Sequence, residues 1–341
     1  MDLRTQTNNE LITAEHVDLS SLHSIRLFAT KWIDNAPPRR LDMIVLCANT
    51  LTPPGGKPDV TEDGLEATWA LNYVANFHLL GILSPALRAQ PPDRDVRIIF
   101  GTCSSYMGGT LPDANALEDQ NAASKPSSKS KLKASSKPES KPEAIPFAPS
   151  SAYASSKLAL MTFASAFQKH LSDYSRPDKQ PMNARVIMVD PGWTRTPGMR
   201  RYLTFGSLWG LALYLMAWPL WWLVLKSPEQ GAQSFLHSAM EAQLGRGVGG
   251  KLIKECREVR LMRDEIQNEE AQKGLWEASE RTVQALEKEG AMRRAREKKE
   301  RGEQEKTGVI GEVGEDEKRD GSGANAIGAR KSGPRRSKRG T

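Results

Sequence analysis

The stretch "VRIIFGT" (96–102) is a short apolar run of the kind that forms a buried strand in a parallel sheet. A similar run, "DMIVLCA" (42–48), lies upstream of it, and a long helical pattern over 61–87 separates the two. A third run, "ARVIMVDPG" (184–192), follows another helical pattern over 150–173. Strands and helices that alternate in this way predict an α/β fold, with a parallel sheet between two layers of helices.

Further elements flank this centre. A helix over 20–33 is expected to begin at Ser20 or Ser21, because either side chain can cap it. Another helix is expected over 227–243, where "SPEQ" places a proline in the first turn. The run "GKLIKECREV" (250–259) predicts a last strand.

Two segments of the predicted domain 1–259 differ from the rest in composition. Residues 120–146 are rich in Ser, Lys and Pro and predict a disordered insertion, because they offer almost no apolar surface to bury. Residues 202–225 carry no charge and are long enough to span a bilayer. Pro219 and the cluster of Trp residues favour broken helices that lie in the headgroup layer instead. A buried helix, or the wall of a lipophilic pocket, is the alternative.

The C-terminal part is strongly charged. Residues 260–306 predict a charged helical extension, and residues 307–341 predict a disordered basic tail. The tail includes "KSGPRRSKRG", which could contact acidic lipid or nucleic acid, although a solvated tail is favoured.

The chain of 341 residues has 48 Lys and Arg against 41 Asp and Glu, a formal net charge of +7. This surplus suits an anionic membrane surface, nucleic acid or an anionic cofactor, and does not choose among them. The three cysteines, Cys47, Cys103 and Cys256, are scattered without disulfide or metal-ligand spacing. We therefore expect a reducing compartment and no metal site. The polar start, "MDLRTQTNNE", is not typical of a signal peptide.

The stretch "SAYASSKLAL" (151–160) places Tyr153 and Lys157 four residues apart, on one face of the predicted helix. Such a pair can be an ordinary helix turn. It is also what proton transfer needs, because a phenol can give a proton to a carbonyl oxygen during reduction. A lysine one turn away would stabilise the phenolate and lower the pKa of Tyr153 towards working pH.

Six motifs follow one another in an order that resembles one known family. They are "DLS" (18–20), "LCAN" (46–49), "NYVANFHL" (72–79), "CSSYMGG" (103–109), "YASSK" (153–157) and "DPGWTRT" (190–196). Over roughly residues 11–255 the chain resembles the short-chain dehydrogenases/reductases, and among them the membrane-associated retinol-dehydrogenase-like and fungal lipid-droplet members. The resemblance implies a Rossmann-like fold and hydride transfer with a nicotinamide cofactor, NADP being expected and NAD the alternative.

The resemblance also assigns roles to single residues. The catalytic residues would be Asn72, Ser105, Tyr153 and Lys157, with Ser104 as the alternative to Ser105. Tyr153 would be the general acid and base, Lys157 its partner and a ribose ligand, Ser105 a donor to the substrate, and Asn72 the holder of a relay water. The cofactor would be bound by Asp18, Asn49, Tyr153, Lys157, Pro191, Gly192 and Thr196.

The chain departs from the family pattern at its start. The family begins with a strand, Thr-Gly-x-x-x-Gly-x-Gly and a helix, whereas this chain begins near what would be the third strand, "ELITAEHVDL" (10–19). We therefore expect an N-terminally truncated sheet in which about 10–15 Å separates that strand from 42–48, since strands lie about 4.8 Å apart. The run 42–48 would then be an exposed apolar edge. Gly245, Gly247 and Gly250 match G-x-G-x-x-G but follow a helix and precede a strand, which is the wrong context for a phosphate site.

The function expected from these features is an oxidoreductase that interconverts a lipophilic alcohol and its ketone or aldehyde. We expect it at the cytosolic face of the endoplasmic reticulum or of lipid droplets, with a homodimer as one option. The alternative is a truncated, catalytically weak or inactive homologue that acts as a membrane-bound interaction protein. A nucleic-acid binder ranks last, because no reader motif accompanies the basic segments.

Overall fold

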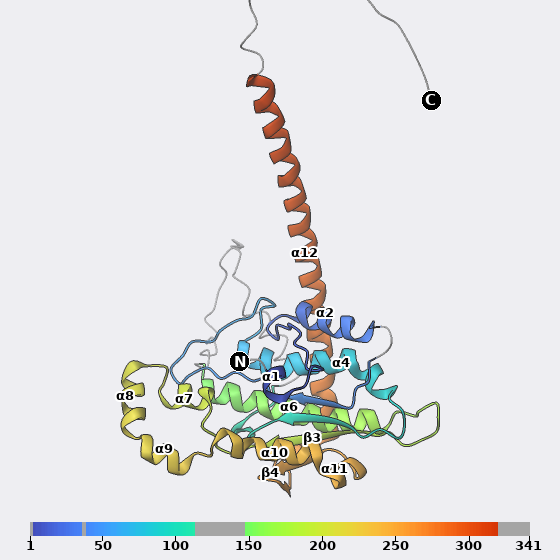
Figure 1. Ribbon diagram of the computed structural model, residues 1–341, viewed down its shortest axis with the longest axis vertical. Helices are drawn as coiled ribbons and strands as arrows, with labels where there is room; N and C mark the ends of the chain where they lie inside the picture. The colour runs from blue at the N-terminus through green and yellow to red at the C-terminus, as the bar shows by residue number, and fades with distance from the viewer. Residues whose placement is uncertain (1–2, 36–38, 113–146, 320–341) are drawn as a thin grey trace, which may run out of the picture. The chain divides into compact units, whose positions relative to one another are not determined.

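The computed structural model describes residues 3–35, 39–112 and 147–319, with side chains as far as residue 301 (Figure 1). The predicted insertion 120–146 lies outside the described residues. The chain divides into two units, Met1–Lys288 and Glu289–Thr341, and the first of them holds the sheet. The predicted domain boundary at residue 259 therefore falls inside the first unit.

A five-stranded sheet in the order β1-β2-β3-β4-β5 forms the centre of the first unit. Its strands are β1 (Met43–Leu46), β2 (Val96–Gly101), β3 (Ala184–Asp190), β4 (Lys251–Lys254) and β5 (Arg257–Val259). Neighbours from β1 to β4 pair in parallel, and β5 pairs with β4 in antiparallel fashion. The α/β fold and its parallel strands are thus confirmed.

The predicted last strand over 250–259 is two strands joined by a tight turn. Glu255 and Cys256 both have positive φ, 52° and 60°. Positive φ at both central residues is the signature of the two-residue turns that match the twist of a β-hairpin. The prediction of one strand was wrong because neither residue is a Gly or Asn that would signal such a turn.

The edge of the sheet differs in part from the expectation. β1 is the edge strand, and its Met43 and Val45 side chains are exposed, so the predicted apolar edge is confirmed. Residues 10–19 form no strand, so the predicted third strand and the gap beside it are wrong. They lead instead from the short helix α1 (Leu3–Thr7) into α2 (Leu22–Ile33), which Ser21 caps by accepting from the Ser24 N–H.

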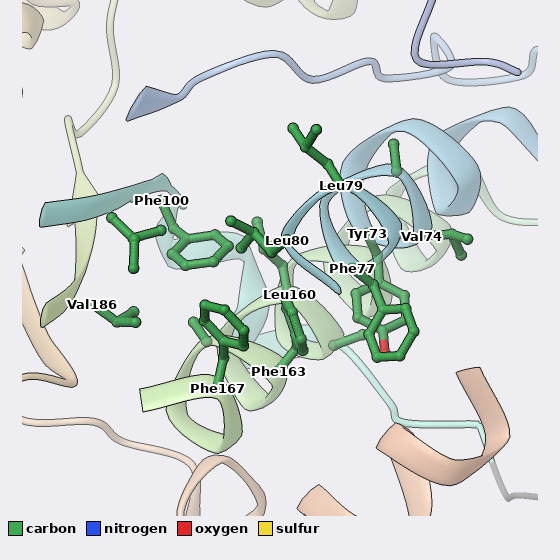
Figure 2. Close-up of a cluster of buried hydrophobic side chains, with 14 of the residues drawn as sticks. Tyr73, Val74, Phe77, Leu79, Leu80, Phe100, Leu160, Phe163, Phe167 and Val186 are labelled. Carbon is green, nitrogen blue, oxygen red and sulfur yellow. The ribbon is translucent and has the colours of Figure 1, made fainter. Parts of the chain in front are cut away.

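Two hydrophobic clusters pack on the two faces of the sheet, as the alternation of side chains along a strand requires. Ile98 and Phe100 face α4 (Ala75–Arg88) and α6 (Pro149–Ser172). Figure 2 shows this cluster, in which the Phe100 and Phe163 ring centroids are 6.2 Å apart. On the other face, Ile99, Ile187, Val189 and Ile253 pack with Leu244, Phe235 and Ala239 of the helices α10 (Pro228–Met240) and α11 (Ala242–Arg246).

The long central helix is interrupted near its start. It consists of α3 (Ala67–Trp69), a π-helical turn η1 (Ala70–Val74) and α4. Its first turn is capped by Glu66, whose carboxylate accepts from two backbone N–H groups, so the helix begins later than the predicted residue 61. Among the described residues, one helix, Ala67–Arg88, is long and apolar enough to cross a membrane. However, 72% of its most apolar stretch is buried inside the protein.

The apolar segment 202–225 is broken into short helices, as its Pro and Trp residues predict. The end of α7 (Pro197–Leu203) enters the segment, and α8 (Leu208–Met216) and α9 (Trp218–Val224) follow. None approaches the roughly 20 helical residues needed to span a bilayer.

One long helix, α12 (Glu269–Arg319), replaces the predicted extension and the first part of the predicted tail. The helix continues past residue 306, which is the predicted end of the extension. The first turns of α12 belong to the core of the first unit: the Trp276 ring lies 5.6 Å from that of Phe77, and Ser279 shares a 2.6 Å hydrogen bond with the buried Tyr73 hydroxyl.

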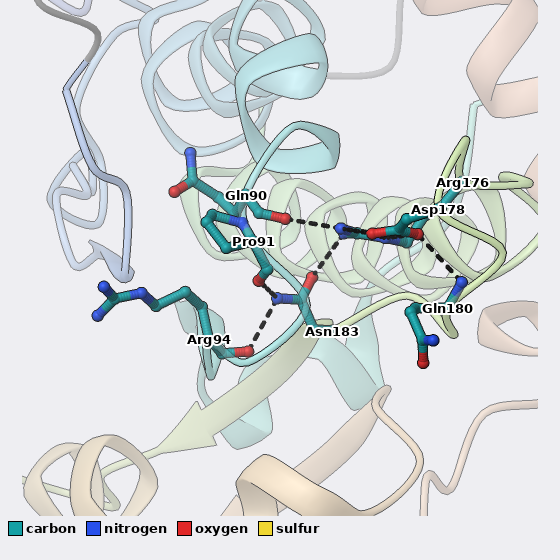
Figure 3. Close-up of polar contacts among 7 residues, drawn as sticks. All are labelled: Gln90, Pro91, Arg94, Arg176, Asp178, Gln180 and Asn183. Atoms are coloured by element: carbon teal, nitrogen blue, oxygen red, sulfur yellow. Dashed lines mark hydrogen bonds and ion pairs between the residues drawn. The ribbon is translucent and has the colours of Figure 1, made fainter.

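A buried polar cluster fixes the loops at the amino ends of β2 and β3 (Figure 3). Arg176 donates to the Gln90 carbonyl at 2.9 Å and to the Asn183 side chain at 3.2 Å. Asn183 in turn donates to the carbonyls of Pro91 and Arg94 at 2.7 and 2.8 Å. Because these groups are withdrawn from water, each needs its partner, and the cluster holds the sheet in register from the end opposite the cavity described next.

Candidate active site

A cavity of about 870 Å³ opens at the carboxyl ends of β1, β2 and β3. The chain that leaves each strand contributes to its wall: Cys47 and Asn49 follow β1, Thr102 and Cys103 follow β2, and Pro191 and Gly192 follow β3. In open α/β sheets this end is where ligands bind. The volume lies within the range of small-molecule and cofactor sites.

Tyr153 and Lys157 both line this cavity from α6. The Lys157 ammonium lies 5.7 Å from the centroid of the Tyr153 ring. Lys157 is only 2% exposed and donates to the Gly101 carbonyl at 2.9 Å. Burial lowers the pKa of Lys157, because it penalises the charged form. The pair that the sequence singled out is therefore brought together in the site.

The pKa of Tyr153 is raised, whereas the sequence predicted that Lys157 would lower it. Burial of the phenol is the main cause, and Cys103 and Asp190 raise the pKa further by opposing negative charge on the ring oxygen. The expected direction was wrong because the periodicity of a helix says nothing about how deeply its residues are buried. In the protein alone, Tyr153 holds its proton at neutral pH.

Cys103 lies at the reacting group. Its thiol donates to the Tyr153 hydroxyl, with 3.6 Å between sulfur and oxygen. Sequence reasoning treated this residue only as part of the serine loop. The signal it missed is position: Cys103 comes two residues after the last residue of β2, at the end of the sheet where the cavity opens.

The two predicted serines lie close by but are placed differently. Ser105 is exposed and lines the cavity, and among the described residues no hydrogen bond joins it to Tyr153. Ser104 donates to the Asp190 carboxylate and accepts from the Lys254 ammonium at 2.8 Å. Asp190 is buried, and its carboxylate lies 3.5 Å from the Lys254 ammonium. Ser104 therefore ties the loop after β2 to the ends of β3 and β4.

Asn72 joins two segments that lie next to the cavity. It is fully buried in the π-helical turn, and its amide donates to the Thr50 carbonyl and to the Ser156 hydroxyl, both at 3.0 Å. Its oxygen accepts from the Thr50 N–H at 2.8 Å. Asn72 is not among the cavity-lining residues, whereas Thr50 is. It thus fixes the segment after β1 against α6.

The residues assigned to the cofactor fall into two groups. Pro191, Gly192, Thr196 and Asn49 line the cavity together with Tyr153 and Lys157. Gly192 has a φ of +74°, which favours glycine, and its N–H donates to the Asp190 carboxylate at 2.9 Å. Asp18 is not among the lining residues, and its carboxylate accepts from the backbone and hydroxyl of Ser20. These hydrogen bonds lower the pKa of Asp18.

Within the described part of the chain, no group of three or more His, Cys, Asp and Glu residues could hold a metal ion. The polar groups that line the cavity include a phenol, a buried ammonium, the two thiols of Cys47 and Cys103, hydroxyl groups, the Asp190 carboxylate and the Arg201 guanidinium.

Comparison with known proteins gives close relatives, although no family model matches the chain. The chain is 43% identical over 289 residues to the uncharacterized oxidoreductase pbr1 of Schizosaccharomyces pombe, covering 85% of this chain and 71% of that protein. It is 28% identical over 282 residues to human retinol dehydrogenase 13, covering 83% and 72%. It is 30% identical over 261 residues to mouse polyprenol dehydrogenase, covering 76% and 64%.

Proposed function

Because the chain belongs to the short-chain dehydrogenase/reductase family of oxidoreductases, we propose that it interconverts a lipophilic alcohol and its ketone or aldehyde with NADP or NAD as cofactor. The observation that carries this proposal is the Tyr153 phenol, set in a cavity of about 870 Å³ between a thiol and a buried ammonium. That arrangement can offer a proton to a carbonyl oxygen bound in the cavity.

The cavity has features that fit the nicotinamide and ribose end of such a cofactor. An ammonium has three donors, and the described residues give Lys157 one hydrogen-bond partner, the Gly101 carbonyl. Because the ammonium is buried, its other N–H groups need acceptors as well, and ribose hydroxyls can supply them. Gly192 and Thr196 also line the cavity, and the resemblance implies that they would contact the nicotinamide. When bound, the cofactor supplies or accepts the hydride.

Tyr153 then handles the proton. Its raised pKa keeps the phenol protonated at neutral pH, so it can give a proton to the carbonyl oxygen as negative charge develops there. Lys157 supplies a positive charge close to the phenolate that this step leaves. The sequence predicted Ser105 as the second donor to the substrate oxygen, with Ser104 as the alternative. We assign this role to Cys103 instead, since its thiol already contacts the phenol; all three residues line the cavity.

The substrate end of the cavity supports a lipophilic substrate. Apolar side chains from three regions of the chain line it: Leu51, Leu203, Trp221, Leu225 and Phe235. The relatives named retinol dehydrogenase and polyprenol dehydrogenase are named for long apolar alcohols, which agrees with such a wall. The three free cysteines agree with the proposed location, the cytosolic face of the endoplasmic reticulum or of lipid droplets.

The decisive experiment compares wild type with Tyr153→Phe on a panel of long-chain and isoprenoid alcohols and ketones, with each cofactor. We expect kcat to fall about 10²- to 10⁴-fold, because the proton donor is lost. Tyr174→Phe is the matched control, since Tyr174 lies outside the cavity and should leave kcat unchanged. No turnover by wild type, together with no binding of either cofactor by calorimetry, would instead support the inactive interaction protein.

A further inference from the structure

The outer faces of α8 and α9 carry large apolar side chains in contact with water. The most exposed are Leu208 and Trp209 at 85% each, Leu223 at 79% and Met216 at 76%. Leu213, Leu215, Trp218, Leu220, Trp222 and Val224 are also exposed. Isolated exposed apolar residues are ordinary, but a contiguous set on two consecutive helices marks an interaction surface. We call these ten residues the apolar face.

The inner side of the same helices is packed. Tyr214 is buried, and its ring stacks on that of Trp221 with centroids 5.9 Å apart and an angle of 12°. The Trp218 ring meets Tyr214 edge-on at 6.0 Å. Trp221 and Leu225 line the cavity. The two helices therefore form a thin apolar wall, with the cavity on one side and the apolar face on the other.

Positively charged side chains lie beside this wall. Arg200 and Arg201 are exposed in the last turn of α7, and neither forms an ion pair within the described part of the chain. The Arg195 guanidinium lies 5.8 Å from the Trp222 ring centroid. Residues 202–225 contain no Asp or Glu. The surface therefore combines Trp and aliphatic side chains with a cationic rim, the composition that suits the headgroup layer of an anionic membrane.

We propose that the apolar face docks on an anionic phospholipid bilayer, with α8 and α9 lying in the interface rather than crossing it. α8 and α9 have 9 and 7 residues, so they reach only the boundary between headgroups and acyl chains. A two-fold contact between two copies would bring the cationic rims of both towards each other, which disfavours a second copy as the occupant.

This docking deepens the proposed function, on which its catalytic consequence rests. The cavity is lined by two residues of α7, Tyr202 and Leu203, and by two residues of the segment that carries the apolar face, Trp221 and Leu225. A substrate dissolved in the bilayer would then reach the cavity past apolar side chains, without first entering water. The bilayer binding itself needs no cofactor and no catalysis.

Flotation of the full-length protein with vesicles tests the proposal directly. The probes are phosphatidylcholine vesicles and vesicles with about 30% phosphatidylserine, each at low and high salt, without cofactor or substrate. We expect the wild type to bind the anionic vesicles at least tenfold more tightly, and salt to weaken this binding. The double variant Trp209→Glu/Leu223→Glu should lose binding at least 100-fold. Val248→Glu is the control, because Val248 is 81% exposed elsewhere and should leave binding unchanged.

The outcomes separate this inference from the proposed function. Tyr153→Phe should bind vesicles like wild type, and the double variant should keep turnover of a short, water-soluble ketone, because neither substituted residue lines the cavity. Equal melting temperatures show that the double variant folds. The docking proposal is overturned if the double variant still binds vesicles. It is also overturned if the wild type is a dimer without lipid and the double variant is a monomer. Both results leave the enzymatic proposal intact.

Discussion

Replacing Cys103 by Ala and by Ser tests whether its thiol takes part in catalysis or only fills space. The thiol donates to the Tyr153 hydroxyl at 3.6 Å and lines the cavity. Ala removes the donor, whereas Ser keeps a donor at the same position. A role in catalysis therefore predicts that the two variants behave differently, since Ala removes the γ atom with its proton and Ser replaces the sulfur by a hydroxyl oxygen.

The size of the effect follows from the type of donor. Loss of one strong donor to a developing oxyanion lowers kcat by about 10² to 10³. A thiol is a weak donor, and 3.6 Å is a long contact, so we expect the Ala variant to lose about tenfold, or roughly 1.4 kcal/mol of transition-state stabilisation. The Ser variant should stay within about threefold of wild type. Because Cys103 also raises the pKa of Tyr153, its removal should move the pH profile of alcohol oxidation to lower pH.

The assay is the initial rate of ketone reduction, followed by the loss of reduced-cofactor fluorescence in detergent micelles. N-ethylmaleimide provides an independent measurement, because its addition to the Cys103 sulfur should inactivate the wild type. The fraction of activity lost should equal the fraction of the Cys103 tryptic peptide that carries one adduct. Cys256→Ser should stay sensitive, since Cys256 lies in the β4–β5 turn, outside the cavity lining. An Ala variant with wild-type kcat and an unshifted pH profile would refute the assignment.

Three further predictions concern proton transfer, stability and association. The rate of alcohol oxidation should rise about tenfold per pH unit between pH 7 and 9, because oxidation needs the phenolate of Tyr153 and the pKa of this phenol is raised. The rate of ketone reduction should stay constant over the same range. Initial rates measured across this pH range check both expectations. Asn183→Ala should lower the free energy of unfolding by about 2–3 kcal/mol in urea titrations, because Arg176 and two buried carbonyls lose a partner. Val45→Lys on the exposed edge strand should slow aggregation measured by light scattering, without changing the melting temperature by more than about 2 °C.

Sequence reasoning found the parts of the fold that depend on local pattern. The apolar runs that became β1, β2 and β3 could be read directly, because a strand covered on both faces needs nearly continuous apolar residues. The cap at Ser21 and the break in 202–225 were also readable, since capping and helix breaking act over a few residues.

The features that were missed depend on contacts between distant segments. Asp190 and Lys254 are opposite each other in the β3–β4 register, and only that pairing brings the Ser104 hydroxyl between them. The contact of Cys103 with Tyr153 likewise depends on how α6 crosses the end of β2. No spacing in the sequence encodes either distance, whereas the Tyr153 and Lys157 spacing lies within one helix turn and was found.

The charges around Tyr153 also bear on the direction of catalysis. Burial, Cys103 and Asp190 all raise the pKa of the phenol, and the nearby Lys157 ammonium is itself made less basic by burial. The protein alone therefore keeps the proton on Tyr153, which prepares it to donate during reduction. In oxidation that proton must leave before Tyr153 can accept one from the alcohol, and the protein's own electrostatics oppose its departure. The oxidation rate should therefore depend on pH through Tyr153 far more strongly than the reduction rate does.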